Sequence, residues 1–489
     1  MGAVELRADL SQLVDALVSG NKEHIITSVR DYLRQNEAPD VLIGRIGLIA
    51  AQGDSEGHVV ATLGAAAILC RYLHFVPQPL EPDALDNREY DNWSRALPLF
   101  AEAMLAAIPA VQAGYDAPEK YPEPYFPSAL MDTGKSVREV MQDAVLKGDT
   151  QLVERIIFGL YGTGADYRTM QVRTYDGIAT TFQDGGHPLT LAVRGFQNLD
   201  AVEWGDRAPR IIHWLAPHLT LKKETQEPAW VNTVRNFVSE HHDGLARLRV
   251  RITTPHDEDA LPLRELLLTN TDAGQLCQAV YDALLKGEAS PAGVCSVIAL
   301  AAADMLLRIP ENDQATFTRV AHGLLYSAAT RTAIHQSRQD DDVLPLIFFS
   351  AAYVNAIQRD LAAQKGQTQA ATTPEVATTH KGGGFIGVTQ LENLREELSK
   401  NDFASAYNTA RRYLQLGHDP RALFGSIGLV AAQIDATAEQ GHALQIVQAV
   451  SEEFISWPRS LKKTSIDAFV QVALRAATTG PRDPLITGL

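Results

Sequence analysis

Four histidines of this 489-residue chain occur in similar surroundings, and their residue type and context suggest metal chemistry. Each is followed by a stretch rich in small and apolar residues. Glycine precedes three of them and alanine precedes the fourth; the four are His58, His187, His322 and His442. We expect each to begin a helix, where the positive end of the helix dipole disfavours protonation of the imidazole. A neutral imidazole is the form that binds a transition metal. The pattern therefore predicts that these four histidines are ligands of one ion.

Carboxylates lie within a few residues of three of these histidines. Glu56, Asp184 and Glu439 are candidates for a catalytic acid or base, or for groups that orient a metal-bound imidazole through its second nitrogen; Asp54 and Asp435 lie nearby as well. Because histidine and carboxylate occur there without thiolate, the set favours iron, manganese or zinc over copper(I) or a cluster. We expect iron, in an oxidoreductase or oxygenase that acts on a small organic molecule. A haem held by two of the histidines is a variant of this expectation.

The sequence also repeats itself. Residues 16–54 align without a gap to residues 397–435, at a constant shift of 381 (397 − 16). After a three-residue insertion in the later copy, the pair Gly57-His58 meets Gly441-His442. Weaker copies begin near residues 144 and 283 and lead to the other two histidines. Such self-similarity is typical of a repeated helical unit.

The local patterns are those of helices. Apolar side chains at Leu10, Leu13, Val14 and Leu17 follow the i, i+3, i+4, i+7 spacing of one buried helical face. Pro39 suits the opening turn of a following helix, where its missing N–H costs nothing. No segment shows the sustained alternation that a sheet requires. The sequence therefore predicts an all-α fold.

We expect four diverged helical units arranged in a closed, pseudo-symmetric way around a central pocket. Successive copies begin about 115–140 residues apart, which is longer than the periods of ordinary solenoids, so stacking is disfavoured. The predicted segments are a first unit (1–113), a Pro/Tyr-rich loop (114–133), a second unit (134–270), a shortened third unit (271–362), a flexible linker (363–388) and a fourth unit (389–489).

Composition excludes several classes of partner. The formal net charge of −16 argues against nucleic acid or an anionic membrane surface, because no basic field exists to attract them. No unbroken run of about 18 apolar residues occurs, so we expect no membrane span. The odd number and wide separation of the cysteines, Cys70, Cys277 and Cys295, predict buried free thiols. Together with a start that lacks the features of a secretory signal, they indicate a cytoplasmic protein.

The other histidines have no counterpart at an equivalent position. His213 and His218 flank Pro217 and are interpreted as helix-end residues. His335 follows His322 by thirteen residues on the same predicted helix, and at 100° per residue it faces about 220° away. We therefore leave these three outside the predicted site.

Two alternatives stay open. A non-catalytic helical scaffold, or an accessory protein that binds a partner, predicts four histidines that lie far apart and whose replacement changes only stability. A metal-free enzyme would use one histidine as a general base. Distances among the four imidazoles separate the first alternative from a shared site.

Two short motifs resemble the His-led helices of helical proteins and domains associated with bacterial Rieske-type oxidoreductases: HGLLYSAATRTAI at His322 and DGGHPLTLAVRG at His187. The likeness covers only these motifs. It implies a bacterial oxidative enzyme or its helical accessory, with both histidines in the functional pocket. The chain lacks the Cys/His pairs that bind a cluster in that group. The resemblance then implies electrons from the substrate, from a diffusible reductant or from a separate electron-donor protein.

Overall fold

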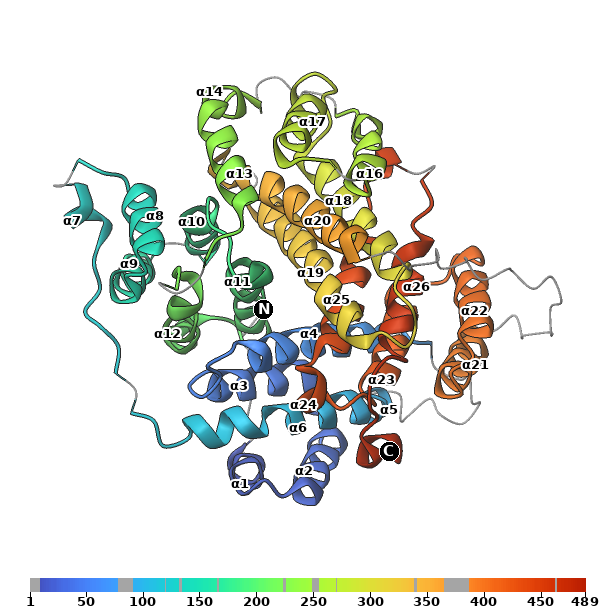
Figure 1. The fold of residues 1–489 in the computed structure, drawn as a ribbon. Coiled ribbons are helices and arrows are strands. Elements are labelled where there is room, and N and C mark those ends of the chain that lie inside the picture. Colours follow the sequence, from blue (N-terminus) through green and yellow to red (C-terminus); the bar gives the residue numbers. More distant parts are fainter. Residues whose placement is uncertain are drawn as a thin grey trace.

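The computed structural model describes residues 9–77, 91–118, 120–131, 134–164, 167–222, 226–248, 255–269, 271–337, 341–364, 387–461 and 464–489. Across these residues the regular elements are helices (Figure 1). The described ranges contain no strand, and their one isolated β-bridge joins Ile434 to Arg482. The all-α prediction is confirmed.

The two copies that align in the sequence fold into the same succession of elements. The first comprises α1 (Ser11–Ser19), α2 (Lys22–Arg34), α3 (Pro39–Ala50) and α4 (His58–Tyr72). The last comprises α21 (Gly387–Ser399), α22 (Phe403–Gln415), α23 (Pro420–Ala431) and α25 (His442–Ile455). The short helix α24 (Ala436–Glu439) lies where the later copy carries its three-residue insertion.

Local signals explain where these helices begin and end. Pro39 and Pro420 each occupy the first turn of a helix, as expected. Gly20 ends α1 in a left-handed conformation with φ of +67°, which a residue without Cβ adopts at little cost. Asn21 then caps α2 by accepting a hydrogen bond from the backbone N–H of His24, and Asp402 caps α22 by accepting from the N–H of Ser405.

The chain between these copies is also helical. Its longer helices are α6 (Leu97–Gly114), α8 (Val137–Lys147), α9 (Thr150–Gly162), α10 (Tyr167–Ile178), α11 (His187–Ala201), α12 (Ala208–Leu219), α13 (Ala229–Glu240), α17 (Ala273–Leu285), α18 (Pro291–Leu307), α19 (Gln314–Gln336) and α20 (Pro345–Gln364). The last copy is followed by α26 (Asp467–Ala476).

Two predicted connections differ from expectation in their extent. The described part of 115–126 is not helical, but the predicted Pro/Tyr-rich loop also contains the one-turn helix α7 (Pro127–Met131). Most of the predicted linker, 365–386, lies outside the described residues. Its two ends belong to helices, because α20 continues to Gln364 and α21 starts at Gly387.

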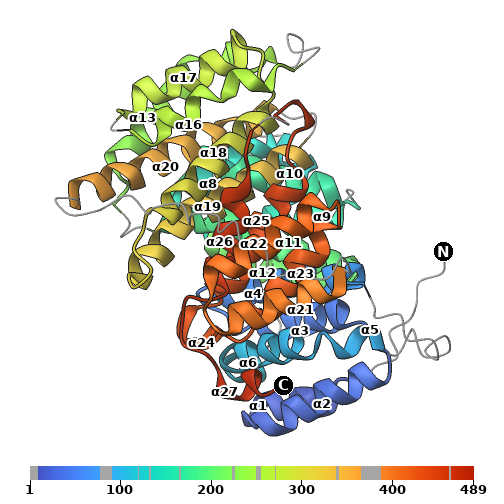
Figure 2. The same ribbon diagram turned by 90° about the vertical axis from the view of Figure 1, so that its right-hand side faces the viewer.

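Four helices close a bundle at the centre of the molecule. Helix α4 packs against α11 and α25, and α19 packs against the same two helices. Figures 1 and 2 both place these four in the middle, with α1, α2, α3 and α6 on one side and α13, α17, α18 and α20 toward the opposite side. Each of the four carries one of the predicted histidines. A closed bundle lets side chains from different helices meet at one point.

Helices 58–75 and 97–114 are long and apolar enough to cross a membrane by length and composition alone. Within the protein, 61% and 67% of these stretches are buried. Helix α4 contacts α3, α6, α11, α23 and α25. Contacts on several sides account for an apolar surface that extends around the helix.

The three cysteines are buried and free, as predicted.

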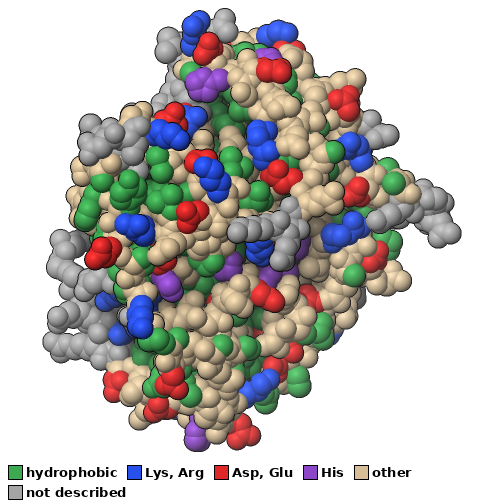
Figure 3. All heavy atoms as spheres, turned by 60° about the vertical axis from the view of Figure 1, so that its left-hand side comes forward, with side chains coloured by type: hydrophobic (Ala, Val, Ile, Leu, Met, Phe, Trp, Pro, Cys, Tyr) green, Lys and Arg blue, Asp and Glu red, His purple; other side chains and the backbone are tan. Residues whose placement is uncertain are grey.

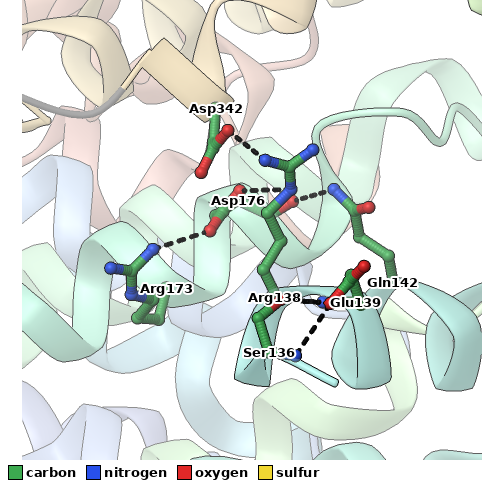
Figure 4. Close-up of polar contacts among 7 residues, drawn as sticks. All are labelled: Ser136, Arg138, Glu139, Gln142, Arg173, Asp176 and Asp342. Carbon is green, nitrogen blue, oxygen red and sulfur yellow. Dashed lines mark hydrogen bonds and ion pairs between the residues drawn. The ribbon is translucent and has the colours of Figure 1, made fainter. Parts of the chain in front are cut away.

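A buried carboxylate braces the segment that leads to α11 (Figure 4). Asp176 on α10 is fully buried, and Arg173 donates to it at 3.0 Å while Arg138 of α8 lies 3.6 Å away. Arg138 also pairs with Asp342, and Gln142 donates to the backbone carbonyl of Asp176. A buried charge needs such partners, since an unpaired one would carry a large desolvation cost. The contacts hold α8 and α10 beside the bundle.

A second buried carboxylate supports the segment before α25. Glu102 on α6 is 1% exposed, and one of its oxygens accepts a hydrogen bond of 2.7 Å from the backbone N–H of Ala436, which begins α24. The other oxygen has no hydrogen-bond partner. Burial raises the pKa of Glu102 to about 8. The folded chain therefore keeps a proton on this carboxyl where the unfolded chain does not.

Replacing Glu102 should change how stability depends on pH. Between its ordinary pKa of 4.5 and its folded pKa of about 8, the folded chain binds more protons than the unfolded chain. The free energy of unfolding then falls as pH rises through this window. Glu102→Gln removes that decline, so its stability relative to the parent chain should grow from about pH 5 to about pH 8 in urea denaturation. A difference that does not vary with pH would contradict this account; Glu56→Gln, at an exposed position, is the control.

Candidate functional site

The four predicted histidines meet inside the central bundle. Their rings form a closed circle of neighbours: the centroids of His58 and His187 lie 5.0 Å apart, those of His187 and His322 5.2 Å, those of His322 and His442 4.9 Å, and those of His442 and His58 5.3 Å. Side chains that are up to 384 positions apart in the chain (442 − 58) are thus neighbours in the folded protein. Figure 3 shows histidine side chains gathered near the middle of one face.

Three of these histidines begin a helix, as predicted, and one does not. His58, His187 and His442 are the first residues of α4, α11 and α25. The prediction is wrong for His322, which lies inside α19 because that helix already begins at Gln314. Asp313 caps α19 by accepting from the N–H of Thr316, so the chain enters the helix more than two turns earlier. The backbone amide of His322 is therefore not at the positive end of the helix dipole.

The glycines before the three helix-starting histidines interlock with the neighbouring helix. Gly57, Gly186 and Gly441 have φ of +86°, +89° and +69°, in the left-handed region that favours glycine. A Cβ atom at these positions would overlap Leu191, Tyr326 and Thr62, respectively. Each of those contacts lies four residues after the histidine of the next helix. The steric fit explains why no larger residue stands before these histidines.

Two of the imidazoles are oriented by backbone carbonyls. The Nδ1 of His442 lies 2.6 Å from the carbonyl oxygen of Glu439, and the ring of His322 is hydrogen-bonded to the backbone of Arg319. Both are contacts to the third residue before the histidine. The two Nε2 atoms then face each other at 3.2 Å. A carbonyl oxygen can only accept, so the Nδ1 of His442 carries the hydrogen of a neutral ring and its Nε2 presents a lone pair.

Burial keeps the four imidazoles neutral. It lowers the pKa of His58 to about 3 and the pKa of His187 and His322 to about 4, and it also lowers the pKa of His442. The neighbouring imidazoles add to this effect for the first three, because positive charges at such short range would repel. The site is thus a cluster of uncharged nitrogen donors at neutral pH.

A cavity of about 580 Å³ opens beside the ring of histidines. Its walls come from α4, α11, α12, α19 and α20 and from the turns before α4 and α11; they include His58, His187, His322, Lys222 and Tyr353. Known small-molecule sites span about 300–1,000 Å³, so an organic molecule would fit. Lys222 forms an ion pair of 2.9 Å with Asp184 at this cavity.

The predicted carboxylates have different places. Glu56 is exposed and, with Asp184, lines the cavity. The charge of Asp184 raises the pKa of His187, against the larger effect of burial. The carboxylate of Glu439 faces the segment at Gly480, burial raises its pKa to about 7, and only its backbone reaches a histidine. Among the described residues, no hydrogen bond joins any of these three carboxylates to a ring nitrogen of the four histidines.

Sequence reasoning missed His218, which lines the same cavity. Its ring is hydrogen-bonded to the backbone of Asp54, whose carbonyl also accepts from Trp214. Burial lowers its pKa to about 4. His218 is at the end of α12, as interpreted, but that helix packs against α11 and α9 and so delivers the ring to the site. No counterpart elsewhere in the chain marks it, so repetition could not have revealed it.

Asp54 organises the turn that presents His58. Its side chain is 6% exposed and accepts hydrogen bonds from the backbone N–H of Gly57 at 3.0 Å and of Val60 at 2.9 Å. Asp435, at the equivalent position of the last copy, accepts from the amides of Thr437 and Ala438. Both aspartates therefore act as helix caps.

Removing the Asp54 carboxylate should destabilise the fold. Asp54→Ala leaves two buried amides without an acceptor, and we expect the free energy of unfolding to fall by about 1–3 kcal/mol in chemical denaturation. Glu56→Ala, two residues away and exposed, is the matched control and should change it by less than about 0.5 kcal/mol. Equal effects of the two substitutions would show that Asp54 does not hold the turn.

Comparison with known proteins returns no relative: no protein-family model, no curated protein and no solved structure matches this chain. The resemblance of the motifs at His187 and His322 to Rieske-associated helical proteins therefore stays a prediction.

Proposed function

We propose that the chain binds one transition-metal ion, iron, through His58, His187, His322 and His442, and acts as an oxidoreductase or oxygenase on a small organic molecule held in the adjacent cavity. The observation that carries this proposal is the approach of two imidazole nitrogens, on His322 and His442, to 3.2 Å.

Two neutral imidazoles favour this approach only if one Nε2 carries a hydrogen and donates it, or if another species lies between the two nitrogens. Where both Nδ1 atoms donate to backbone carbonyls, both Nε2 atoms present lone pairs, and the lone pairs repel. A shared proton would relieve the repulsion, but burial disfavours a charged imidazole here. A bound cation would relieve it as well. An ion about 2.1 Å from each nitrogen would see the two at an angle of roughly 100°, which tetrahedral and octahedral coordination both tolerate.

The remaining imidazoles must adjust for all four to bind. In the described part of the chain, no group of three or more His, Cys, Asp or Glu side chains stands in ready position to hold an ion. The rings of His58 and His187 are nevertheless in contact with each other and with the facing pair. Small rotations about side-chain bonds would turn their nitrogens inward. Metal binding would then couple to a local ordering of the site.

The choice of iron rests on the donor type. Imidazole nitrogen without thiolate suits iron, zinc and other first-row ions. Bound iron would supply redox chemistry toward oxygen or polarise a substrate. A haem is less compatible with the distances, since a porphyrin would separate two imidazoles that bind its iron from opposite faces, whereas here the ring centroids of His322 and His442 lie 4.9 Å apart in a T-shaped contact. We therefore propose an ion without a porphyrin.

We further propose that the four units are arranged pseudo-symmetrically around this centre. The contacts before the histidines support this, because they run in one direction around the bundle: Gly57 of α4 meets α11, Gly186 before α11 meets α19, and Gly441 before α25 meets α4. The step from α19 to α25 lacks the glycine contact, since His322 lies inside its helix. The third unit would thus be the most diverged.

The chain's own residues would bind and position the substrate. Leu191 and Tyr353 offer apolar surface in the cavity, whereas Lys222, Arg319 and His218 offer polar contacts to an oxygen-bearing molecule. Electrons would come from the substrate, a diffusible reductant or a separate donor protein, and we place the activity in the cytoplasm. The scaffold alternative predicts dispersed histidines, which differs from the distances observed here.

Metal analysis tests the proposal directly. Protein produced with added iron should carry about one ion per chain, and His322→Ala should lose most of it because a buried nitrogen donor is removed. His335→Ala is the matched control, since this exposed histidine lies on the same helix. Elemental analysis would reject the proposal if the parent chain held no stoichiometric iron, manganese or zinc, or if both variants retained the metal equally.

A further inference from the structure

His58 borders two cavities. One is the 580 Å³ cavity already described, and the other, of about 280 Å³, lies between α4, α6 and α24. Ser55, Glu56 and His58 belong to the walls of both. Because these three residues precede and begin α4, the start of that helix forms the partition. The histidine cluster can therefore be approached from two sides.

The second cavity is about half the size of the first. Its volume of about 280 Å³ lies at the lower limit of the range of about 300–1,000 Å³ that small-molecule sites occupy, so it suits small molecules. Much of its wall is small or apolar, being formed by Gly53, Val59, Ala106, Pro109, Ala110 and Ala436. A molecule of two or three atoms fits such a space, and an apolar wall favours a neutral one over an ion.

The buried polar groups of this wall are already engaged. Asp54 accepts from two backbone amides, and the hydroxyl of Thr62 donates to the carbonyl of His58 at 2.7 Å. Gln440 reaches Glu56 at 3.5 Å across the exposed side. Few groups remain to hold a charged ligand in place. The cavity is thus better suited to let a small neutral molecule pass through than to bind a charged ligand.

We infer that the cavity between α4, α6 and α24 is a separate entrance through which a neutral diatomic molecule, such as dioxygen, reaches the metal centre at His58. The larger cavity is then left to the organic substrate. This inference rests on the proposed function, because an entrance has a purpose only if the histidines hold a metal. It assigns a role to α6, which carries none of the four histidines.

Narrowing the small cavity provides the test. Ala106 on α6 is 6% exposed and lines it, so Ala106→Leu would fill part of the space. Ala113→Leu on the same helix, at an exposed position outside the cavity wall, is the matched control. The probe is nitric oxide, a neutral diatomic molecule, mixed without oxygen with the iron(II)-loaded full-length chain. Its association rate is followed by absorbance in stopped flow.

We expect Ala106→Leu to slow association by about tenfold or more while its iron content stays that of the parent chain, and Ala113→Leu to leave the rate unchanged. If Ala106→Leu fails to fold or to hold iron, Ala106→Val takes its place with a smaller slowing expected. Equal rates in iron-loaded parent and Ala106 variants would overturn the entrance and leave the proposed function standing. A parent chain that binds no iron would overturn both.

Discussion

The interaction on which the site depends is the close approach of four uncharged imidazoles inside the bundle formed by α4, α11, α19 and α25. Four rings from α4, α11, α19 and α25 lie with neighbouring centroids about 5 Å apart. Packing supports this arrangement, since left-handed glycines let the turns before His58, His187 and His442 press against the next helix. Burial lowers the pKa of the imidazoles, so they stay neutral and do not repel one another as positive charges would. Within this cluster the Nε2 atoms of His322 and His442 face each other at 3.2 Å, and the proposed cation would lie between them.

Buried acidic groups support this arrangement from outside the ring. Asp54 binds the amides of the turn before α4, and Glu102 binds the amide that opens α24, just before α25. Asp435 caps the equivalent turn of the last copy, so the two copies share this aspartate as well as the histidine. Glu102 provides an additional anchor for α24, which lies where the later copy carries its three-residue insertion.

Much of the architecture follows from the sequence, and the reasons are local. Helical periodicity, prolines at helix starts and the repeat of Gly57-His58 at Gly441-His442 are properties of neighbouring residues, so they can be recognised in a single sequence. His322 was misplaced within its helix because an upstream aspartate, Asp313, caps α19. His218 could not be found, because only the packing of α12 brings it to the cavity. The exact meeting of the rings likewise depends on tertiary contacts, and from sequence it was a hypothesis.

The central claim is that one metal ion is bound by imidazoles from all four histidine-bearing helices. X-ray absorption at the iron edge of the loaded protein measures this most directly, because imidazole rings give a characteristic outer-shell scattering. The account predicts about four imidazole nitrogens near 2.1 Å and no sulfur ligand. A spectrum with one imidazole or none, or with a thiolate ligand, would contradict it.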